Sequence, residues 1–165
     1  MVSIRLATTE DAHDIDAMVR ELATHENTLD DVHATAESWK AVLARPDVTV
    51  FIARAGGDAV GFVSTLRRLH LWSGGDLLAL DDLYVRPGYR DKGIGTLLMN
   101  TVAAFASRED LIVIWGARLD NHAGHRFYLR LGATLSTKTT AAWTPEAYNR
   151  HLAQGVAVQV VDTHA

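Results

Sequence analysis

The sequence contains no cysteine, which excludes a disulfide framework, a thiolate metal site and a cysteine nucleophile. It also lacks an excess of basic residues. The net charge of −4 argues against nucleic acid as the main partner, since phosphate binding needs a basic surface. No apolar run reaches membrane length, and the start MVSIRLATTEDAHD lacks the long apolar core of a signal peptide. We therefore expect a cytoplasmic protein without a nucleic-acid or membrane partner.

Internal repeats, low-complexity tracts and linkers are also missing, so the sequence predicts one domain over residues 1–165. The chain is long enough to bury a sizeable core. Its apolar fraction of 48% and charged fraction of 22% are typical of a soluble globular protein.

The stretch 77–105 organises the rest of the chain. A nearly continuous apolar run over residues 77–85 predicts a strand buried on both faces, and a Pro-Gly pair ends it. From Gly93 the apolar residues recur at helical spacing, which predicts a helix packed on the sheet. Between strand and helix lies the sequence RDKGIGT, residues 90–96.

This loop has the features of a phosphate-binding loop. Gly93 and Gly95 let the backbone approach a ligand, and the free N–H groups of a first helical turn favour a phosphate. A short glycine pattern is a weak signal, so an ordinary strand–loop–helix connection remains the alternative. The Gly-Lys-Ser/Thr of a P-loop is absent, and Leu98 replaces the third glycine of the dinucleotide fingerprint. We interpret the loop as a pyrophosphate-binding loop of another kind.

Other elements are predicted from periodicity and turn residues. Alternating or β-rich runs predict strands at 3–6, 48–54, 59–66, 111–115, 134–143 and 156–161, the last of which could pair with another subunit. A Gly-Gly-Asp turn makes 48–66 a hairpin, residues 67–76 are expected to form a connection, and 24–35 a polar loop. Helices are predicted after Thr8 or Thr9, at 35–45, from Asp120 or Asn121 to Gly132, and at 144–152. The strand–helix–strand unit at 77–115 predicts a right-handed parallel crossover.

Two sequence blocks resemble the GNAT family of N-acetyltransferases. The first is Val85-x-Pro-x-x-Arg-x-x-Gly-x-Gly, which is similar to the coenzyme A loop of that family. The second is NHAGHRFYLRLG at 121–132, which is similar to its Asn-x6-Tyr followed by x3-Gly. Within the family, LDDLYV at 80–85 followed by Tyr89-Arg90 looks most like the diamine (spermidine/spermine-type) and thialysine acetyltransferases. The resemblance is specific over 77–132 and weak elsewhere.

The resemblance implies an α/β fold with a mixed, mostly antiparallel central sheet that is flanked by helices and splayed at the central strand. It also implies a homodimer and acetyl-CoA as co-substrate, without a metal. Three groups of cofactor-binding residues are implied. The backbone of one strand pairs with the pantetheine arm (Leu83, Tyr84 and Val85), and a loop holds the pyrophosphate (Arg90, Asp91, Lys92, Gly93, Ile94, Gly95 and Thr96). The later block adds Asn121 and Gly124. The sequence is equally consistent with Asn121 as a helix-capping residue only.

Tyr128 matches the position of the family's general acid, which protonates the departing thiolate. A phenol has an ordinary pKa near ~10 and is therefore protonated at neutral pH. A tyrosine that only packs beside Phe127 is the alternative.

Asp81 and Asp82 lie inside an apolar strand, where carboxylates are unfavourable unless they are paired, hydrogen-bonded or open to a cavity. Strand alternation points them to opposite faces unless a bulge intervenes. We expect one of them, preferably Asp82, to accept the substrate ammonium, and either to relay its proton through water or only to bind it, with Asp81 and Glu26 helping to bind the amine. A carboxylate satisfied by local backbone or by an arginine is the alternative.

The predicted function is transfer of an acetyl group from acetyl-CoA to a primary amine of a small molecule, with a polyamine or a diamino acid preferred. Direct attack is favoured because the sequence offers no cysteine for a covalent intermediate. The alternatives are an aminoglycoside or peptide N-terminus as acceptor, or a non-catalytic acyl-CoA sensor. His122 and His125 lie one helical turn apart but lack an accompanying carboxylate motif, so no metal site is expected.

Overall fold

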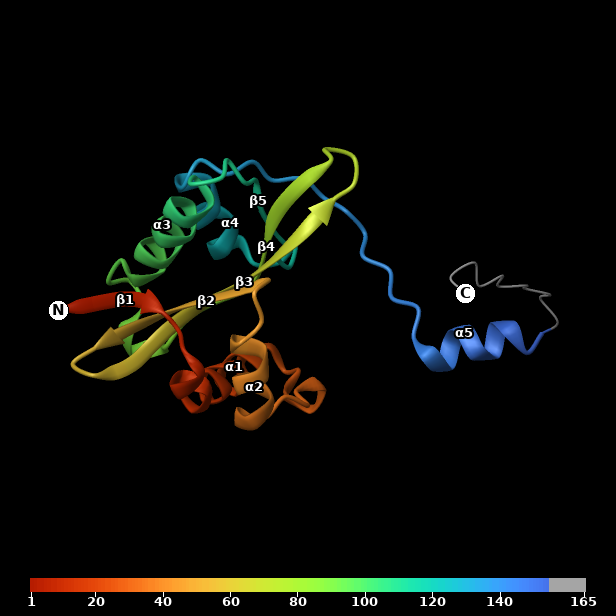
Figure 1. Cartoon of the computed structure of the whole chain (residues 1–165), viewed down its shortest axis with the longest axis horizontal. Coiled ribbons are helices and arrows are strands. Elements are labelled where there is room, and N and C mark those ends of the chain that lie inside the picture. Colours follow the sequence, from red (N-terminus) through yellow and green to blue (C-terminus); the bar gives the residue numbers. More distant parts are fainter. Residues whose placement is uncertain (155–165) are drawn as a thin grey trace. The chain divides into compact units, whose positions relative to one another are not determined.

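The computed structural model describes residues 1–154 and divides the chain into two compact units, Met1–His125 and Arg126–Ala165 (Figure 1). Each unit is described by itself. The expectation of a single domain over 1–165 stays a prediction, and the strand predicted at 156–161 lies outside the described residues.

The first unit is built on a five-stranded sheet with the order β1-β2-β3-β4-β5. Neighbouring strands from β1 to β4 are antiparallel, and β4 pairs with β5 in parallel. The mixed, mostly antiparallel sheet confirms the predicted fold class, and the parallel crossover is confirmed with it. The strands are β1 (Val2–Leu6), β2 (Val48–Ala55), β3 (Asp58–His70), β4 (Gly75–Val85) and β5 (Val113–Trp115).

The sheet is splayed at β4. This strand pairs with β5 only over Leu78, Ala79 and Leu80, opposite Val113 to Trp115. Beyond Leu80, in the described part of the chain, the β4 edge that faced β5 has no strand partner. On this edge the backbone N–H and C=O groups that point away from β3 are therefore open to an extended ligand, except the Val85 carbonyl, which accepts a hydrogen bond from Arg90.

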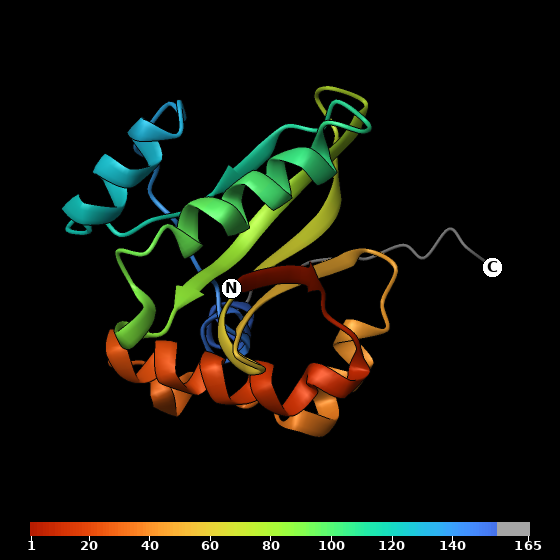
Figure 2. The ribbon, with the colours of Figure 1, turned by 90° about the vertical axis from the view of Figure 1, so that its left-hand side faces the viewer.

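Helices cover both faces of this sheet (Figure 2). The helices α1 (Ala12–Glu26) and α2 (Ala36–Leu43) lie on one face, and α3 (Ile94–Ala106) lies on the other. Under α1 and α2 the core contains Ile15, Met18, Ile52 and Phe62, each fully buried. Burial of such a side chain contributes about 1.5–3 kcal/mol to folding. Short 3₁₀ turns occupy Thr9–Asp11, Leu29–Asp31 and Pro87–Tyr89.

The connection predicted at 67–76 is wrong. β3 continues through His70 and β4 begins at Gly75, which leaves a short turn at 71–74. Charged residues at both ends of this segment lie on the strands and form ion pairs. The Arg67 guanidinium contacts Asp76 across the hairpin at 2.6 Å and Glu109 at 2.7 Å. The polar loop at 24–35 is also shorter than predicted, since α1 continues through Glu26.

Of the two later strands predicted here, one is shorter and more exposed than expected and the other does not form. The strand predicted as buried at 111–115 is shortened to β5, and Ile112 and Ile114 remain 68% and 37% exposed. Residues 134–143 form no strand. In its described part the second unit contains only helical elements, so these residues have no neighbouring strand to satisfy their backbone groups. The helices α4 (His122–Arg130) and α5 (Pro145–Leu152) form as predicted.

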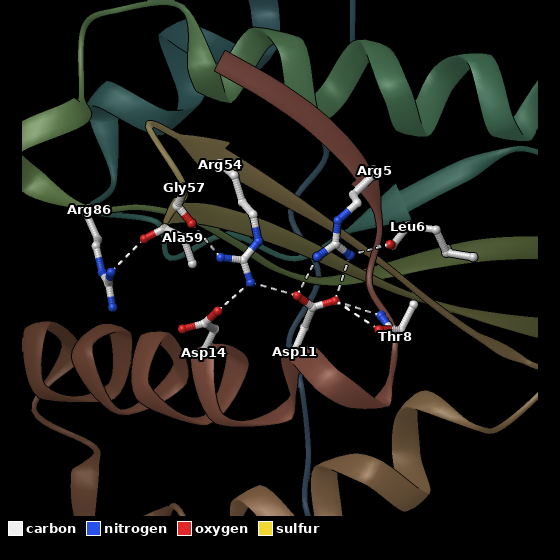
Figure 3. A network of polar contacts seen from close by, with 9 residues as sticks. All are labelled: Arg5, Leu6, Thr8, Asp11, Asp14, Arg54, Gly57, Ala59 and Arg86. Carbon is white, nitrogen blue, oxygen red and sulfur yellow. Dashed lines mark hydrogen bonds and ion pairs between the residues drawn. The ribbon is translucent and has the colours of Figure 1, made fainter. Parts of the chain in front are cut away.

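A buried carboxylate joins the first two strands to α1 (Figure 3). Asp11 is 2% exposed, and its two oxygens accept hydrogen bonds from Arg5 and Arg54, each at 2.7 Å. Arg54 also donates to Asp14 on α1. The hydrogen bond from Arg5 is the largest of the contacts that hold the pKa of Asp11 far below its ordinary value.

None of the helices in residues 1–154 is long and apolar enough to cross a bilayer.

Candidate active site

A β-bulge places the two adjacent aspartates of β4 on one face of the sheet. The pairing of β3 with β4 shifts so that Val63 lies opposite Leu83 and Thr65 lies opposite Leu80. Asp81 and Asp82 therefore both lie opposite one residue, Ser64. An extra residue of this kind bends the strand and changes the direction of its side chains. The bulge lies directly after Leu80, where β4 separates from β5.

Ser64 supports the bulge from the neighbouring strand. Its hydroxyl accepts a hydrogen bond from the backbone N–H of Asp82 at 3.1 Å and lies 3.4 Å from the Asp82 carboxylate. The Ser64 residue is only 7% exposed. Ser64 is not among the site residues predicted from the sequence. The available signal was a hydroxyl inside the apolar run AVGFVSTL.

The environment of Asp82 favours the protonated carboxyl group. Burial is the largest cause that raises the pKa of Asp82, and the negative charges of Asp81 and Glu26 raise it further. The hydrogen bond from Ser64 acts in the opposite direction. Glu26 is the last residue of α1, so the other two predicted amine-binding carboxylates, Asp81 and Glu26, both act on the pKa of Asp82 within the first unit.

Asp81 and Asp82 border a cavity of about 280 Å³. The cavity lies on the face of the sheet that α1 and α2 cover. Its other lining residues come from α2, the segment after it, and β2 and β3: Trp39, Val42, Arg45, Val48, Val50, Ser64, Thr65 and Leu66. The cavity thus combines a pair of carboxylates with mostly apolar walls.

The loop before α3 has the backbone geometry expected of an anion-binding loop. Gly93 precedes the helix with φ +78°, and Asp91 also has a positive φ of 60°. The first-turn N–H groups of Ile94, Gly95 and Thr96 have no acceptor within the helix. The Ile94 side chain is buried, so only its backbone is available to a ligand. These features fit a pyrophosphate.

Both cations of this loop contact the loop itself. Arg90 donates from Nε to the Val85 carbonyl at 2.9 Å, and Lys92 donates to the Gly88 carbonyl at 2.9 Å. The Lys92 ammonium also lies 5.2 Å from the centre of the Tyr89 ring. In this arrangement the two side chains order the loop as well as adding positive charge near it.

Side chains at the end of β4 and directly after it donate hydrogen bonds to Glu21 of α1. Tyr84 is 4% exposed, and its hydroxyl donates to Glu21 at 3.1 Å. Arg86 donates to the same carboxylate at 2.8 Å. The Tyr84 side chain is therefore occupied in the core, and its neighbours Leu83 and Val85 are half-buried.

Asn121 caps α4. Its side-chain oxygen accepts from the Gly124 N–H at 2.9 Å, as in an N-cap. A Cβ atom at Gly124 would lie 2.6 Å from the Asn121 amide nitrogen, so glycine leaves room for this cap. The capping role foreseen for Asn121 is thus observed.

Tyr128 belongs to the second unit. Its ring centre lies 5.6 Å from that of Phe127, and burial raises the pKa of its phenol above 10. The phenol is therefore protonated at neutral pH. Among residues 1–154, no group of three or more His, Asp or Glu side chains is arranged to hold a metal ion.

Comparison with known proteins identifies the family. The model of the acetyltransferase (GNAT) family matches residues 15–133. The aminoalkylphosphonate N-acetyltransferase of Salmonella typhimurium is 29% identical over 130 residues, which are 78% of this chain and 82% of that protein. The thialysine N-epsilon-acetyltransferase of Bos taurus is 30% identical over 143 residues, which are 80% and 84% of the two chains.

A solved structure shares the fold. AAC(6')-Iy, in complex with the bisubstrate analogue CoA-S-monomethyl-acetylneamine, superimposes with a TM-score of 0.69 at 18% identity and covers 86% of this chain and 97% of its own. The family match and the named relatives make this chain an acyltransferase. The chain belongs to the acetyltransferase (GNAT) family.

Proposed function

We propose that this enzyme transfers an acetyl group from acetyl-CoA to a primary amine of a small molecule by direct attack. The bulge carries the proposal, because it brings Asp81 and Asp82 to one cavity at the point where β4 leaves β5. A carboxylate pair that receives an amine would thereby lie next to an unpaired strand edge suited to an extended thioester carrier.

The residues present fit acetyl-CoA. The backbone of Leu83, Tyr84 and Val85 would pair with the pantetheine arm, and the first-turn N–H groups after Gly93 would hold the pyrophosphate. The rest of the loop and the start of α4 complete the proposed set with Arg90, Asp91, Lys92, Ile94, Gly95, Thr96, Asn121 and Gly124. When bound, acetyl-CoA supplies an activated acyl group.

Asp82 is proposed as the proton acceptor for the amine. The substrate arrives as an ammonium, and its nitrogen can attack only after it loses a proton. The raised pKa of Asp82 makes its carboxylate a better base than an ordinary aspartate, and a water molecule could relay the proton. The amine nitrogen then forms the amide bond as the carbon–sulfur bond breaks.

Tyr128 is proposed as the general acid that gives its proton to the departing thiolate. Its phenol is protonated over the neutral range because burial raises its pKa. Holding donor and amine together would supply much of the remaining acceleration.

The preferred acceptor is a polyamine or a diamino acid, with Asp81 and Glu26 adding negative charge near Asp82. The names of the two relatives, which describe acetylation of thialysine and of aminoalkylphosphonates, support a small amine. An aminoglycoside or a peptide N-terminus is the second acceptor class. A non-catalytic sensor of acyl-CoA would need neither the carboxylate pair nor Tyr128. We also propose that the enzyme is a homodimer and is located in the cytoplasm.

A panel of amines assayed with acetyl-CoA, with thiol release as the signal, tests the function. We expect amine-dependent release, and we expect Asp82→Asn to lower kcat/KM by roughly a hundredfold or more, as for loss of a general base. Coenzyme A affinity measured by titration should stay unchanged in this variant. Thiol release that no amine stimulates would refute the proposed reaction, and normal activity of Asp82→Asn across the panel would leave Asp82 a structural role.

A further inference from the structure

We propose that the cavity beneath α2 binds an acceptor with an amine at one end and an anionic group at the other, and that Arg45 binds the anionic end. This inference rests on the proposed function and narrows the substrate class of the same site: of the two preferred acceptors, it favours the diamino acid, which carries a carboxylate, over the polyamine. It depends on the charges and the separation of the residues that line the cavity.

The strand register places the two charged parts of the lining at different ends. Val48 lies opposite Leu66, and Val50 lies opposite Ser64, which faces the bulge of β4. Val48 is therefore two strands and two residues away from Asp82. With strands about 4.8 Å apart and about 3.3 Å per residue, their Cα atoms are separated by roughly 12 Å.

Arg45 belongs to the Val48 end. Its backbone carbonyl accepts a hydrogen bond from the Val48 N–H at 3.3 Å, and its side chain is exposed at the rim. The guanidinium contacts Asp47 through Nε at 3.0 Å and Nη2 at 2.6 Å. Nη1 lies outside this pair, and a guanidinium can bind a second anion through its remaining donors.

The uncharged lining residues are mostly apolar, with Trp39, Val42, Val48, Val50 and Leu66 beside Ser64 and Thr65. Among the lining residues Asp81 and Asp82 supply the negative charge and Arg45 the positive charge. An amine joined to an acid by a short alkyl chain matches this order of charges. A polyamine of the same length would place an ammonium against the Arg45 guanidinium, and such a like-charge contact selects against it.

A matched set of acceptors tests the proposal. Pentylamine, 1,5-diaminopentane, 6-aminohexanoate and 5-aminopentylphosphonate all carry an amine on a chain of five alkyl carbons, and they differ in the group on the fifth carbon: hydrogen, an amine, a carboxylate or a phosphonate. We expect the two acids to have higher kcat/KM than pentylamine, and 1,5-diaminopentane to have a lower one. The ratio between the two acids shows whether a carboxylate or a phosphonate is the natural group.

Arg45→Gln should lower kcat/KM about five- to tenfold for both acids and leave pentylamine unchanged, as for loss of one charge-assisted contact at a rim. Lys40→Gln is the control, because it removes a positive charge from α2 at a side chain that does not line the cavity. An equal effect of Arg45→Gln on all four amines, or none on any, would overturn the inference. So would a preference of the wild type for 1,5-diaminopentane.

Failure of the proposed acetyl transfer can be distinguished from failure of the Arg45 site by measuring binding directly. If no amine releases thiol, calorimetric titration with 6-aminohexanoate still decides whether the cavity binds an amino acid through Arg45. Binding to the wild type and to Lys40→Gln, with about fivefold or greater weakening in Arg45→Gln, would uphold the binding site. Absence of binding, or equal binding to all three proteins, would refute it.

Discussion

The backbone N–H of Asp82 donates to the side-chain hydroxyl of Ser64 at 3.1 Å, so a side chain supplies the hydrogen bond that the bulge removes from the ladder. The same hydroxyl lies beside the Asp82 carboxylate. Ser64 therefore acts on both the backbone and the charge of the proposed base.

Ser64→Ala should move the acid limb of the pH profile of kcat/KM to higher pH. The hydrogen bond from Ser64 lowers the pKa of Asp82, against burial and the charges of Asp81 and Glu26, which raise it. Without this bond the pKa rises further, and the carboxylate forms only at higher pH. Ser64→Thr retains a hydroxyl and should restore the wild-type profile. Identical limbs in wild type and Ser64→Ala would refute this role.

Tyr128→Phe should reduce kcat by roughly a hundredfold and leave coenzyme A affinity nearly intact, because it removes a proton donor without removing the ring. Since burial raises the pKa of Tyr128 above its ordinary value, the wild-type phenol stays protonated at neutral and mildly basic pH, and kcat should not fall through loss of this proton between pH 7 and 9. Steady-state assays and calorimetry measure the two quantities. Tyr148→Phe removes a phenol hydroxyl from α5 and is the control. Unchanged turnover in Tyr128→Phe would exclude the acid role.

Gly93→Val should abolish binding of coenzyme A, measured by titration. A side chain at this position would crowd the backbone that is proposed to approach the pyrophosphate, and the φ of +78° is unfavourable for valine. Gly74→Val is a matched control because Gly74 also has a positive φ, of 66°, at the tip of the β3–β4 hairpin. Each change should lower stability by about 1–2 kcal/mol. Normal coenzyme A affinity in a folded Gly93→Val protein would place the pyrophosphate elsewhere.

The Asp11 network should make the protein sensitive to acid. The pKa of Asp11 in the folded protein lies below that of the unfolded chain, which is about 3.9. Its stabilising contribution is therefore complete above about pH 5 and is lost as the pH falls below about 4 towards the folded-state pKa.

Asp11→Asn should lower the free energy of unfolding at pH 7 by about 2–4 kcal/mol, because Arg5 and Arg54 lose a buried partner. Chemical unfolding at several pH values measures the effect. The variant should also lose part of the acid dependence of the wild type. A variant with the same pH dependence as the wild type would show that other carboxylates control acid unfolding.

The elements that depend on a local sequence pattern were predicted best. The apolar run before Pro87, the helical spacing after Gly93 and the turn at Gly57 predicted β4, α3 and the β2–β3 hairpin. The register shift between Val63 and Thr65 arises from pairing between separate strands, so no local periodicity could place it.

The errors have related physical causes. Residues 67–76 were predicted as a connection, yet Arg67 and Asp76 at its two ends lie on strands and pair across them. Residues 134–143 have strand-like composition, but a strand also requires a neighbour, which composition does not provide. Ser64 was overlooked because its importance depends on Asp82, which lies on the next strand.

The extra residue of the β4 bulge determines on which side of the sheet Asp81 and Asp82 lie. They share one cavity because β4 is one residue longer than its partner at that point. Deleting a single residue there would restore regular alternation and separate any two consecutive side chains to opposite sides of the sheet. The arrangement of this acidic pair therefore depends on the number of residues in β4 as well as on the chemistry of the two side chains.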